Sequence, residues 1–251
     1  MNDIVVYTAI TDGYDWLNPV PAIWQSEAQF VAFLGKAQPL SGWKIRRIYR
    51  RFRDPCRNAK IHKILSHVYF PDAEYSLWVD GSIRIKSTVA LKKIINTLLD
   101  KHDLAVFKHR FRKCCYQEAV ECLYMQRDPP ELIERQMQNY FEEGYPLNNG
   151  LAECTVLLRR HTQKIAQFNE IWYQEIKSGS RRDQLSFNYA AYKAGIKYRH
   201  LPGTLSDNPH FAWLRHKGLR TSFAPHSIFS PKHPLTNNSR ASDRKIDGVG
   251  M

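Results

Sequence analysis

The chain has 251 residues, 43% of them hydrophobic, which is enough to bury the core of one substantial α/β domain or two small ones, and we favour one. No run approaches the roughly 18 consecutive apolar residues of a membrane span. The first residues lack the basic leader and the long apolar region of a secretory signal, so we expect a cytoplasmic protein. The net charge of +13, from 37 Lys and Arg against 24 Asp and Glu, indicates an anionic partner such as a phosphate compound, nucleic acid or an anionic membrane.

The five cysteines are an odd number and form no C-x-x-C pair, so neither a disulfide framework nor a zinc ribbon is indicated. The positive charge is concentrated in residues 44–63, which contain nine basic residues and the single acid Asp54. Such a stretch is typical of a solvated face or a polyanion-binding patch, and it is equally compatible with a phosphate site.

The first half of the chain begins with three predicted strands, at residues 3–10, 29–35 and 43–48, because these runs are β-branched, apolar or alternating. Asp54 and Pro55 then predict a helix start, with aspartate as N-cap and proline at the first helical position. A fourth predicted strand follows at residues 75–80.

The second half alternates in the same way. We predict strands at 103–109 and 153–160 and helices at 89–99, 116–127, 130–144, 161–177 and from 183 onward. Strands that alternate with helices predict a single-domain α/β fold with a mixed, mostly parallel sheet flanked by helices. The domain is predicted to cover residues 1–229, and the polar, aperiodic residues 230–251 are predicted to be a flexible tail or lid.

Asp80 stands at the end of an apolar strand and is followed by Gly81 and Ser82. One interpretation is an ordinary turn, because Asp-Gly is a strong turn dipeptide. The other is a ligand site, since ligands of α/β sheets gather beyond the carboxyl ends of the strands. The loop after the first strand and the helix start that bears Arg57 and Lys60 are expected at the same edge, where a helix N-terminus favours a phosphate.

Several segments together carry a family resemblance: DPCRNAKIHKIL, LWVDGSIRI, HRFRKCCYQEAVEC, GLAECTVLLRRH and RRDQLSFNYA, in this order. The chain resembles, over roughly residues 4–200, the glycosyltransferase-like domain of the TOD1/MUCI70 type. The resemblance implies a GT-A-like, Rossmann-like fold that uses a nucleotide-sugar, usually a UDP-sugar, and often Mn²⁺ or Mg²⁺.

The resemblance also implies roles for single residues. Asp183 and Gln184 would be catalytic, beside the donor sugar and the acceptor. Asp80 would bind the metal, with Ser82 in place of a second aspartate and His210 or His216 as a late ligand. Tyr116 and Glu118 match a Tyr-x-Glu element of the family. The nucleotide-sugar would be bound by Thr8, Asp12, Tyr14, Arg57, Lys60, Asn149 and Gly150.

Because Ser82 replaces a carboxylate, a cation would bind more weakly, and basic residues such as Arg84, Arg57 or Lys60 could stabilise the departing diphosphate instead. The expected function is transfer of a sugar to a saccharide or lipid-linked acceptor in surface polysaccharide or lipopolysaccharide assembly, with peripheral contact to the inner face of an anionic membrane. The alternative is a non-catalytic binder of polyanions or nucleic acid on the same fold, although acids near the groove disfavour nucleic acid. A lipid amidohydrolase is a third alternative, since ceramidase activity is attributed to a plant relative.

Overall fold

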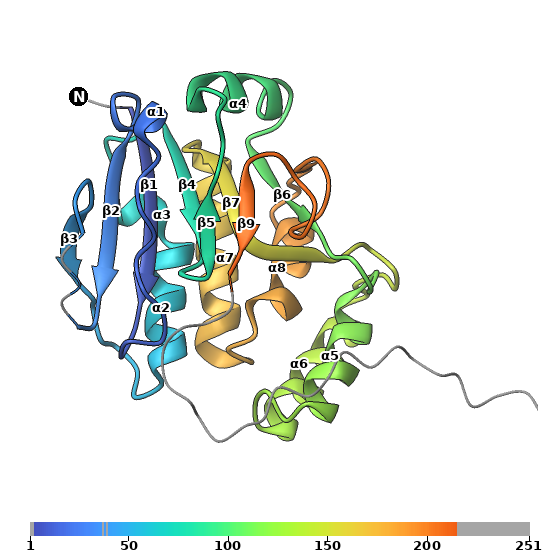
Figure 1. Cartoon of the computed structure of the whole chain (residues 1–251). Helices are drawn as coiled ribbons and strands as arrows, with labels where there is room; N and C mark the ends of the chain where they lie inside the picture. Colours follow the sequence, from blue (N-terminus) through green and yellow to red (C-terminus); the bar gives the residue numbers. More distant parts are fainter. Residues whose placement is uncertain (1–2, 37, 39, 215–251) are drawn as a thin grey trace, which may run out of the picture. The chain divides into compact units, whose positions relative to one another are not determined.

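The structure, a computed structural model, describes residues 3–36, 38 and 40–214, and these belong to one compact unit (Figure 1). The predicted domain boundary at residue 229, the predicted tail and His216 lie outside the described residues. Within the described part of the chain, no helix is both long and apolar enough to cross a bilayer.

A seven-stranded mixed sheet forms the centre of the molecule, with the strand order β3-β2-β1-β4-β7-β6-β8. The strands on the β3 side of the sheet, through β4, run parallel to one another, whereas β7 is antiparallel to both β4 and β6. Their bounds are β1 Ile4–Ile10, β2 Gln29–Leu34, β3 Lys44–Arg47, β4 Tyr75–Val79, β6 Leu104–Lys108, β7 Ala152–Arg160 and β8 Arg199–His200.

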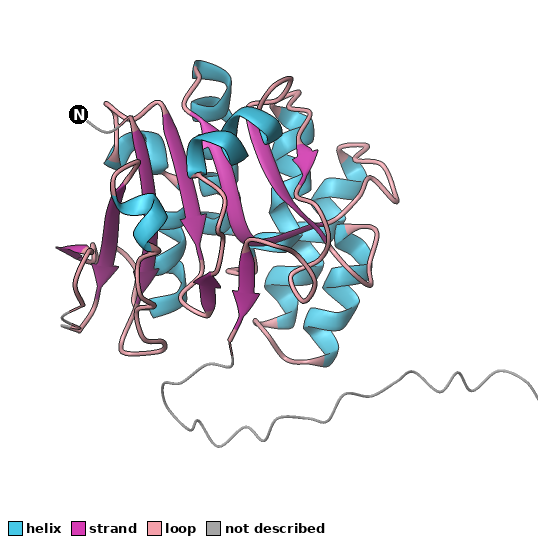
Figure 2. Cartoon of the chain, turned by 45° about the horizontal axis from the view of Figure 1, so that its top comes forward, coloured by secondary structure: helices cyan, strands magenta, loops and turns pink. Residues whose placement is uncertain are grey.

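Helices cover both faces of the sheet (Figure 2). One face packs on α2, α7 and α8 through a core that includes Tyr7, Trp78 and Trp172, and the other packs on α4 and a two-stranded ribbon, β5 with β9. The α5–α6 pair packs against α8. The bounds are α1 Ala22–Gln25, α2 Pro55–Ile64, α3 Ser66–Tyr69, α4 Leu91–Leu98, α5 Cys115–Tyr124, α6 Pro130–Glu142, α7 Gln163–Ser178, α8 Asp183–Lys193, β5 Ile83–Ile85 and β9 Phe211–Trp213.

The reversed direction of β7 determines which residues share an edge. Because β7 is antiparallel, its first residues lie beside the ends of β4 and β6. The amide of Asp80 donates to the carbonyl of Thr155 at 2.9 Å, and the amide of His109 donates to the carbonyl of Leu151 at 2.8 Å. The carboxyl ends of β1, β4 and β6 and the amino end of β7 therefore meet at one edge, which we call the carboxyl edge.

The structure confirms the predicted α/β fold and its long elements. The predicted helix start is also confirmed, because the side chain of Asp54 accepts from the amide of Cys56 at 2.9 Å and Pro55 is the first residue of α2. All five cysteines are free thiols. The short strands β5, β8 and β9 were not predicted.

Candidate functional site at the carboxyl edge

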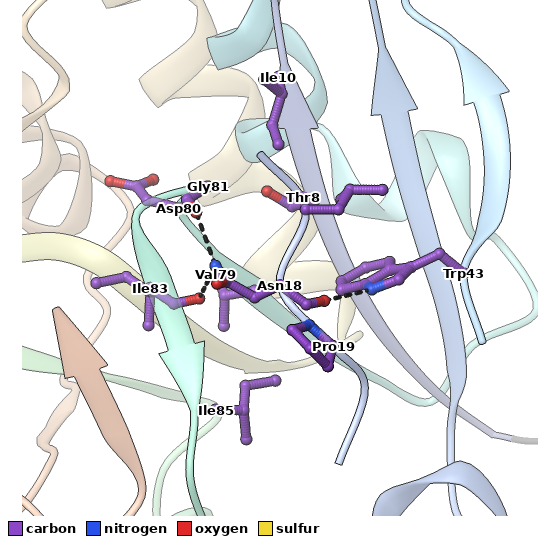
Figure 3. Close-up of a pocket in the computed structure, with 11 residues that line it drawn as sticks. Thr8, Ile10, Asn18, Pro19, Trp43, Val79, Asp80, Gly81, Ile83 and Ile85 are labelled. Carbon is purple, nitrogen blue, oxygen red and sulfur yellow. Dashed lines mark hydrogen bonds between the residues drawn. The ribbon is translucent and has the colours of Figure 1, made fainter. Parts of the chain in front are cut away.

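Asp80 begins a tight turn between β4 and β5. The amide of Ile83 donates to the carbonyl of Asp80 at 2.8 Å, so the turn interpretation of the Asp-Gly pair is correct for the backbone. Asn18 holds the turn from the other side, since its Nδ2 donates to the carbonyls of Gly81 and Ile83 (Figure 3). A side chain at Gly81 would stand 2.9 Å from Cβ of Asp15, so glycine is required by close packing there.

The side chain of Asp80 makes contacts that an ordinary turn does not require. Its carboxylate points away from Asn18 and Trp43 (Figure 3). Oδ1 accepts from the indole Nε1 of Trp78 at 2.7 Å and lies 3.3 Å from Nζ of Lys63, while 29% of the side chain stays exposed. The turn thus presents a partly open carboxylate that is held in place by two donors.

Lys63 connects Asp80 to Asp183, the first residue of α8. Its Nζ lies 2.6 Å from Oδ2 of Asp183, and Nζ of Lys60 lies 2.9 Å from the same oxygen. The side chains of Lys63 and Asp183 are only 1% and 6% exposed. We call this row of alternating charges, Asp80–Lys63–Asp183–Lys60, the charge ladder; it joins the predicted metal, diphosphate and catalytic positions in one network.

Burial and the neighbouring charges have opposite effects on the pKa values of Asp183 and Lys60. Burial alone would raise the pKa of Asp183, but the ammonium groups of Lys60 and Lys63 outweigh it and hold the pKa of this carboxyl well below its usual range. Burial alone would lower the pKa of Lys60, but the carboxylates of Asp183 and Asp80 raise it instead. Asp183 and Lys60 therefore hold each other in the charged form.

In the sequence, Lys63 was only one of the nine basic residues of the stretch 44–63, and its position comes from buried contacts of α2. Its carbonyl accepts from the hydroxyl of Tyr7 at 2.8 Å and from Nη2 of Arg159 at 2.8 Å. Arg159 is fully buried and also donates to the carbonyl of Ile64 at 3.0 Å. The last turn of α2 is thus fixed against the sheet, which directs the Lys63 side chain toward the carboxyl edge.

Arg57 does not join the ladder. Its Nη1 donates to the carbonyl of Ile176 and its Nη2 donates to that of Gly179 at 2.8 Å, and its side chain is 13% exposed. These contacts fix the connection between α7 and α8, next to Asp128 at 3.9 Å. The diphosphate contact predicted for Arg57 is not supported by this arrangement, whereas Lys60 pairs with Asp183 and stays a predicted contact.

The predicted metal ligands do not converge. Ser82 is buried beside Asp80, with its carbonyl accepting from Leu214 at 2.8 Å. His210 lies at the opposite end of the β5–β9 ribbon, where its Nδ1 is 2.9 Å from Oγ of Ser87 and its carbonyl accepts from Lys86. Among the described residues, no group of three or more His, Cys, Asp or Glu side chains could hold a metal ion.

A resident divalent cation therefore does not fit the described residues well. Mg²⁺ and Mn²⁺ prefer several oxygen ligands, and among the predicted ligands only Asp80 supplies a carboxylate. One oxygen of that carboxylate, Oδ1 of Asp80, already faces the Lys63 ammonium. The position of His210 does not fit its predicted role as a metal ligand, because the fold separates it from Asp80.

The residues predicted to contact the nucleotide lie in β1 and in the loop that follows it. Thr8 lines a small pocket together with Asn18, Trp43 and Asp80 (Figure 3). Its buried hydroxyl has no hydrogen-bond partner among the described residues. Tyr14 lies in the loop after β1 and is 54% exposed. Asp12 instead pairs with Arg50 at 2.9 Å, in a left-handed conformation with φ of 51°.

The predicted sugar-side residues gather at the start of β7. Gly150 has φ of +79°, a conformation that favours glycine, and it lies against Nδ2 of Asn188. That same Nδ2 is 3.4 Å from the carbonyl of Asn149. Gln184 approaches the strand from α8, since its Nε2 is 3.4 Å from the carbonyl of Ala152. Asn149–Gly150 and Gln184 thus all lie near the start of β7.

The Tyr-x-Glu element acquires a structural role. Glu118 is 2% exposed, and its Oε2 accepts from Nε of Arg112 at 2.5 Å. Its Oε1 lies 3.7 Å from Nη2 of Arg182, the residue before Asp183. Tyr116 donates to the carbonyl of Tyr145 at 3.2 Å. Glu118 therefore ties the loop after β6 to the start of α8.

Comparison with known proteins found a matching family and two relatives. The sequence profile described as TOD1/MUCI70, glycosyltransferase-like domain, matches residues 25–201. A protein described as probable hexosyltransferase MUCI70, from Arabidopsis thaliana, is 26% identical over 222 residues, covering 77% of this chain and 38% of that protein. Another from the same plant, described as alkaline ceramidase TOD1, is 25% identical over 162 residues, covering 60% of this chain and 35% of that protein.

The chain thus matches well under half the length of either plant relative. The profile match, in contrast, covers most of this chain and includes the whole charge ladder. The described α/β fold and the matched region together identify the chain: it belongs to the TOD1/MUCI70 glycosyltransferase-like domain family.

Proposed function

We propose that the protein is a glycosyltransferase that moves a sugar from a nucleotide-sugar, specifically a UDP-sugar, to a saccharide or lipid-linked acceptor. The observation that carries this proposal is the charge ladder at the carboxyl edge, where Lys63 links Asp80 to Asp183 within 3.3 Å and 2.6 Å. Family membership and the relative described as a probable hexosyltransferase support the same class of reaction.

The ladder suits the charges of such a reaction. Departure of a nucleoside diphosphate develops negative charge, and fixed cations stabilise it without reorganisation. Lys60 supplies such a cation, since its ammonium is held by Asp183 and its side chain is 17% exposed. Asp183 can in turn accept hydrogen bonds from sugar hydroxyls. A divalent cation brought by the donor itself would find Asp80 nearby.

The acceptor and the place of action are proposed on charge. The edge strand β3 and the loop after it expose a row of cations with no acid before Asp54, namely Lys44, Arg47, Arg50, Arg51 and Arg53. This surface favours contact with the anionic inner face of a membrane, where lipid-linked acceptors for polysaccharide or lipopolysaccharide assembly are presented. Nucleic acid would be attracted by the same cations but would gain nothing from Asp80 and Asp183.

The test is binding and turnover of UDP-sugars by the purified full chain, with and without Mn²⁺. UDP is expected to raise the melting temperature, and a panel of UDP-sugars is expected to release UDP slowly. Asp183→Asn should lower UDP release by about 100-fold or more, because it removes the group that fixes both lysines.

Asp72→Asn, in an exposed turn before β4, is the matched control and should leave UDP release unchanged. If UDP shifts the melting temperature in neither condition while single-stranded DNA binds with a steep salt dependence, the binding-protein alternative is favoured over the transferase.

A further inference from the structure

Glu153 is a carboxylate at the carboxyl edge to which the resemblance assigns no role. It is the second residue of β7 and pairs with Phe107 near the end of β6. Two residues further along β7, the carbonyl of Thr155 accepts from the amide of Asp80. The strand therefore places Glu153 beside the Asp80 turn, which the proposed function assigns to the donor.

The carboxylate of Glu153 is largely buried but incompletely paired. The side chain is 13% exposed, and its Oε2 is buried without a hydrogen-bond partner among the described residues. The nearest cation is Nε of Arg110, at 3.9 Å. Nη1 of Arg110 donates to Oγ of Ser206 at 2.6 Å, so the guanidinium is held by the loop before β9. A buried polar oxygen without a partner is costly and is commonly found where a ligand completes the site.

The charges around Glu153 differ in sign from those around Asp183. Burial raises the pKa of Glu153, the carboxylates of Asp80 and Glu118 raise it further, and Arg110 opposes them. Lysines hold the pKa of Asp183 low. Two carboxyls whose pKa values are moved apart are suited to different tasks: the more acidic one accepts hydrogen bonds, and the more basic one accepts a proton.

We propose that Glu153 is the general base that takes the proton of the acceptor hydroxyl, an inference that rests on the proposed transferase function. As the acceptor oxygen bonds to the anomeric carbon, its proton moves to the Glu153 carboxylate. The bond from that carbon to the diphosphate oxygen breaks, and its electron pair leaves with UDP. Glu153 then releases the proton to water. Because this is one displacement, it inverts the anomeric configuration, while Asp183 only positions the sugar.

The experiment compares wild type with Glu153→Gln, which keeps the shape and removes the base. Glu134→Gln, on the exposed face of α6, is the matched control. We expect Glu153→Gln to keep UDP binding, measured by thermal shift with UDP alone, within about threefold. UDP release from UDP-sugars, with water as the hydroxyl, should fall by about 100-fold or more, and the acidic limb of the wild-type pH profile should disappear.

Stability gives a readout that does not depend on a substrate. A raised pKa in the fold means that the stability contributed by the Glu153 carboxyl is fully present below its unfolded pKa, about 4.3, and is lost as pH rises through the folded pKa. The melting temperature of Glu153→Gln should therefore be higher than that of wild type at pH 7 and equal to it at pH 4. A lower melting temperature at pH 7 would mean a structural ion pair with Arg110 and would overturn the proposal.

The outcomes separate this inference from the function on which it rests. If wild type binds UDP and releases it from a UDP-sugar, but Glu153→Gln retains that rate within about threefold, Glu153 is not the base and the transferase stands. Retention of the anomeric configuration in the first-formed sugar, followed by NMR, would overturn the inference in the same way. If wild type neither binds UDP nor releases it from any UDP-sugar, the proposed function fails and the inference falls with it.

Discussion

At the scale of single residues, Lys63 holds the site together. Its side chain is 1% exposed and contacts the carboxylates of Asp80 and Asp183, while its ammonium lies 5.5 Å from the ring centre of Trp78. A buried ammonium is tolerated only when it is paired, and removal of one partner leaves the other charges uncompensated. Lys63 is thus needed both for stability and for the distance between the proposed donor and sugar contacts.

Lys63→Met tests this role. The change keeps much of the side-chain volume but leaves Asp183 with Lys60 alone, so at pH 7 we expect a loss of about 3 to 5 kcal/mol in the free energy of unfolding. Urea unfolding measures it. Lys193→Met, at an exposed ion pair with Glu143, is the control and should leave stability nearly unchanged.

The difference in the free energy of unfolding between wild type and Lys63→Met should also depend on pH, which gives a second test of the role of Lys63. Because the pKa of Asp183 is lowered in the fold, the stability from this pairing is fully present above the unfolded value of about 3.9 and is lost as pH falls through the folded value. The difference in the free energy of unfolding between wild type and Lys63→Met should therefore become smaller below about pH 4. A difference that is equal at pH 7 and pH 3 would mean that lost packing, and not charge, explains the variant.

At the scale of elements, α2 carries the ladder and could be predicted well from the sequence. The Asp-Pro start and the apolar spacing after it specified the helix and the place of Lys60 on it. The direction of the Arg57 side chain could not be predicted, because it depends on carbonyls of the α7–α8 connection more than a hundred residues away. Lys63 was missed for a similar reason: its burial results from Tyr7 and Arg159, which only the folded sheet brings together.

The N-cap of α2 provides the prediction at this scale. Asp54→Ala removes the acceptor for the amide of Cys56 and should cost about 1 kcal/mol or slightly more, since Oδ2 also lies 3.4 Å from Arg181. Asp54→Asn keeps an N-cap oxygen and should cost less. Chemical denaturation of both variants decides between them, and equal losses would show that the ion pair, and not the cap, stabilises the start of α2.

At the scale of the whole molecule, the direction of β7 explains why part of the site was visible in the sequence and part was not. Residues that follow parallel strands, such as Asp80, could be assigned to the carboxyl edge from the chain order alone. Glu153 could not, because it precedes most of its strand and reaches that edge only since β7 runs antiparallel to β4. His210 was expected near Asp80, but β5 and β9 pair in an antiparallel ribbon that separates the two.

In the proposed function, the carboxyl edge binds the diphosphate of a nucleotide-sugar beside the charge ladder. The most direct measurement is a crystal structure of the full chain with UDP, grown with and without Mn²⁺. We expect density for the diphosphate within contact distance of the Lys60 ammonium, at the carboxyl edge that holds Asp80 and Glu153, and a uridine next to Thr8 and Tyr14. UDP bound elsewhere on the molecule, with the Asp80–Lys63–Asp183–Lys60 row out of its reach, would contradict this expectation.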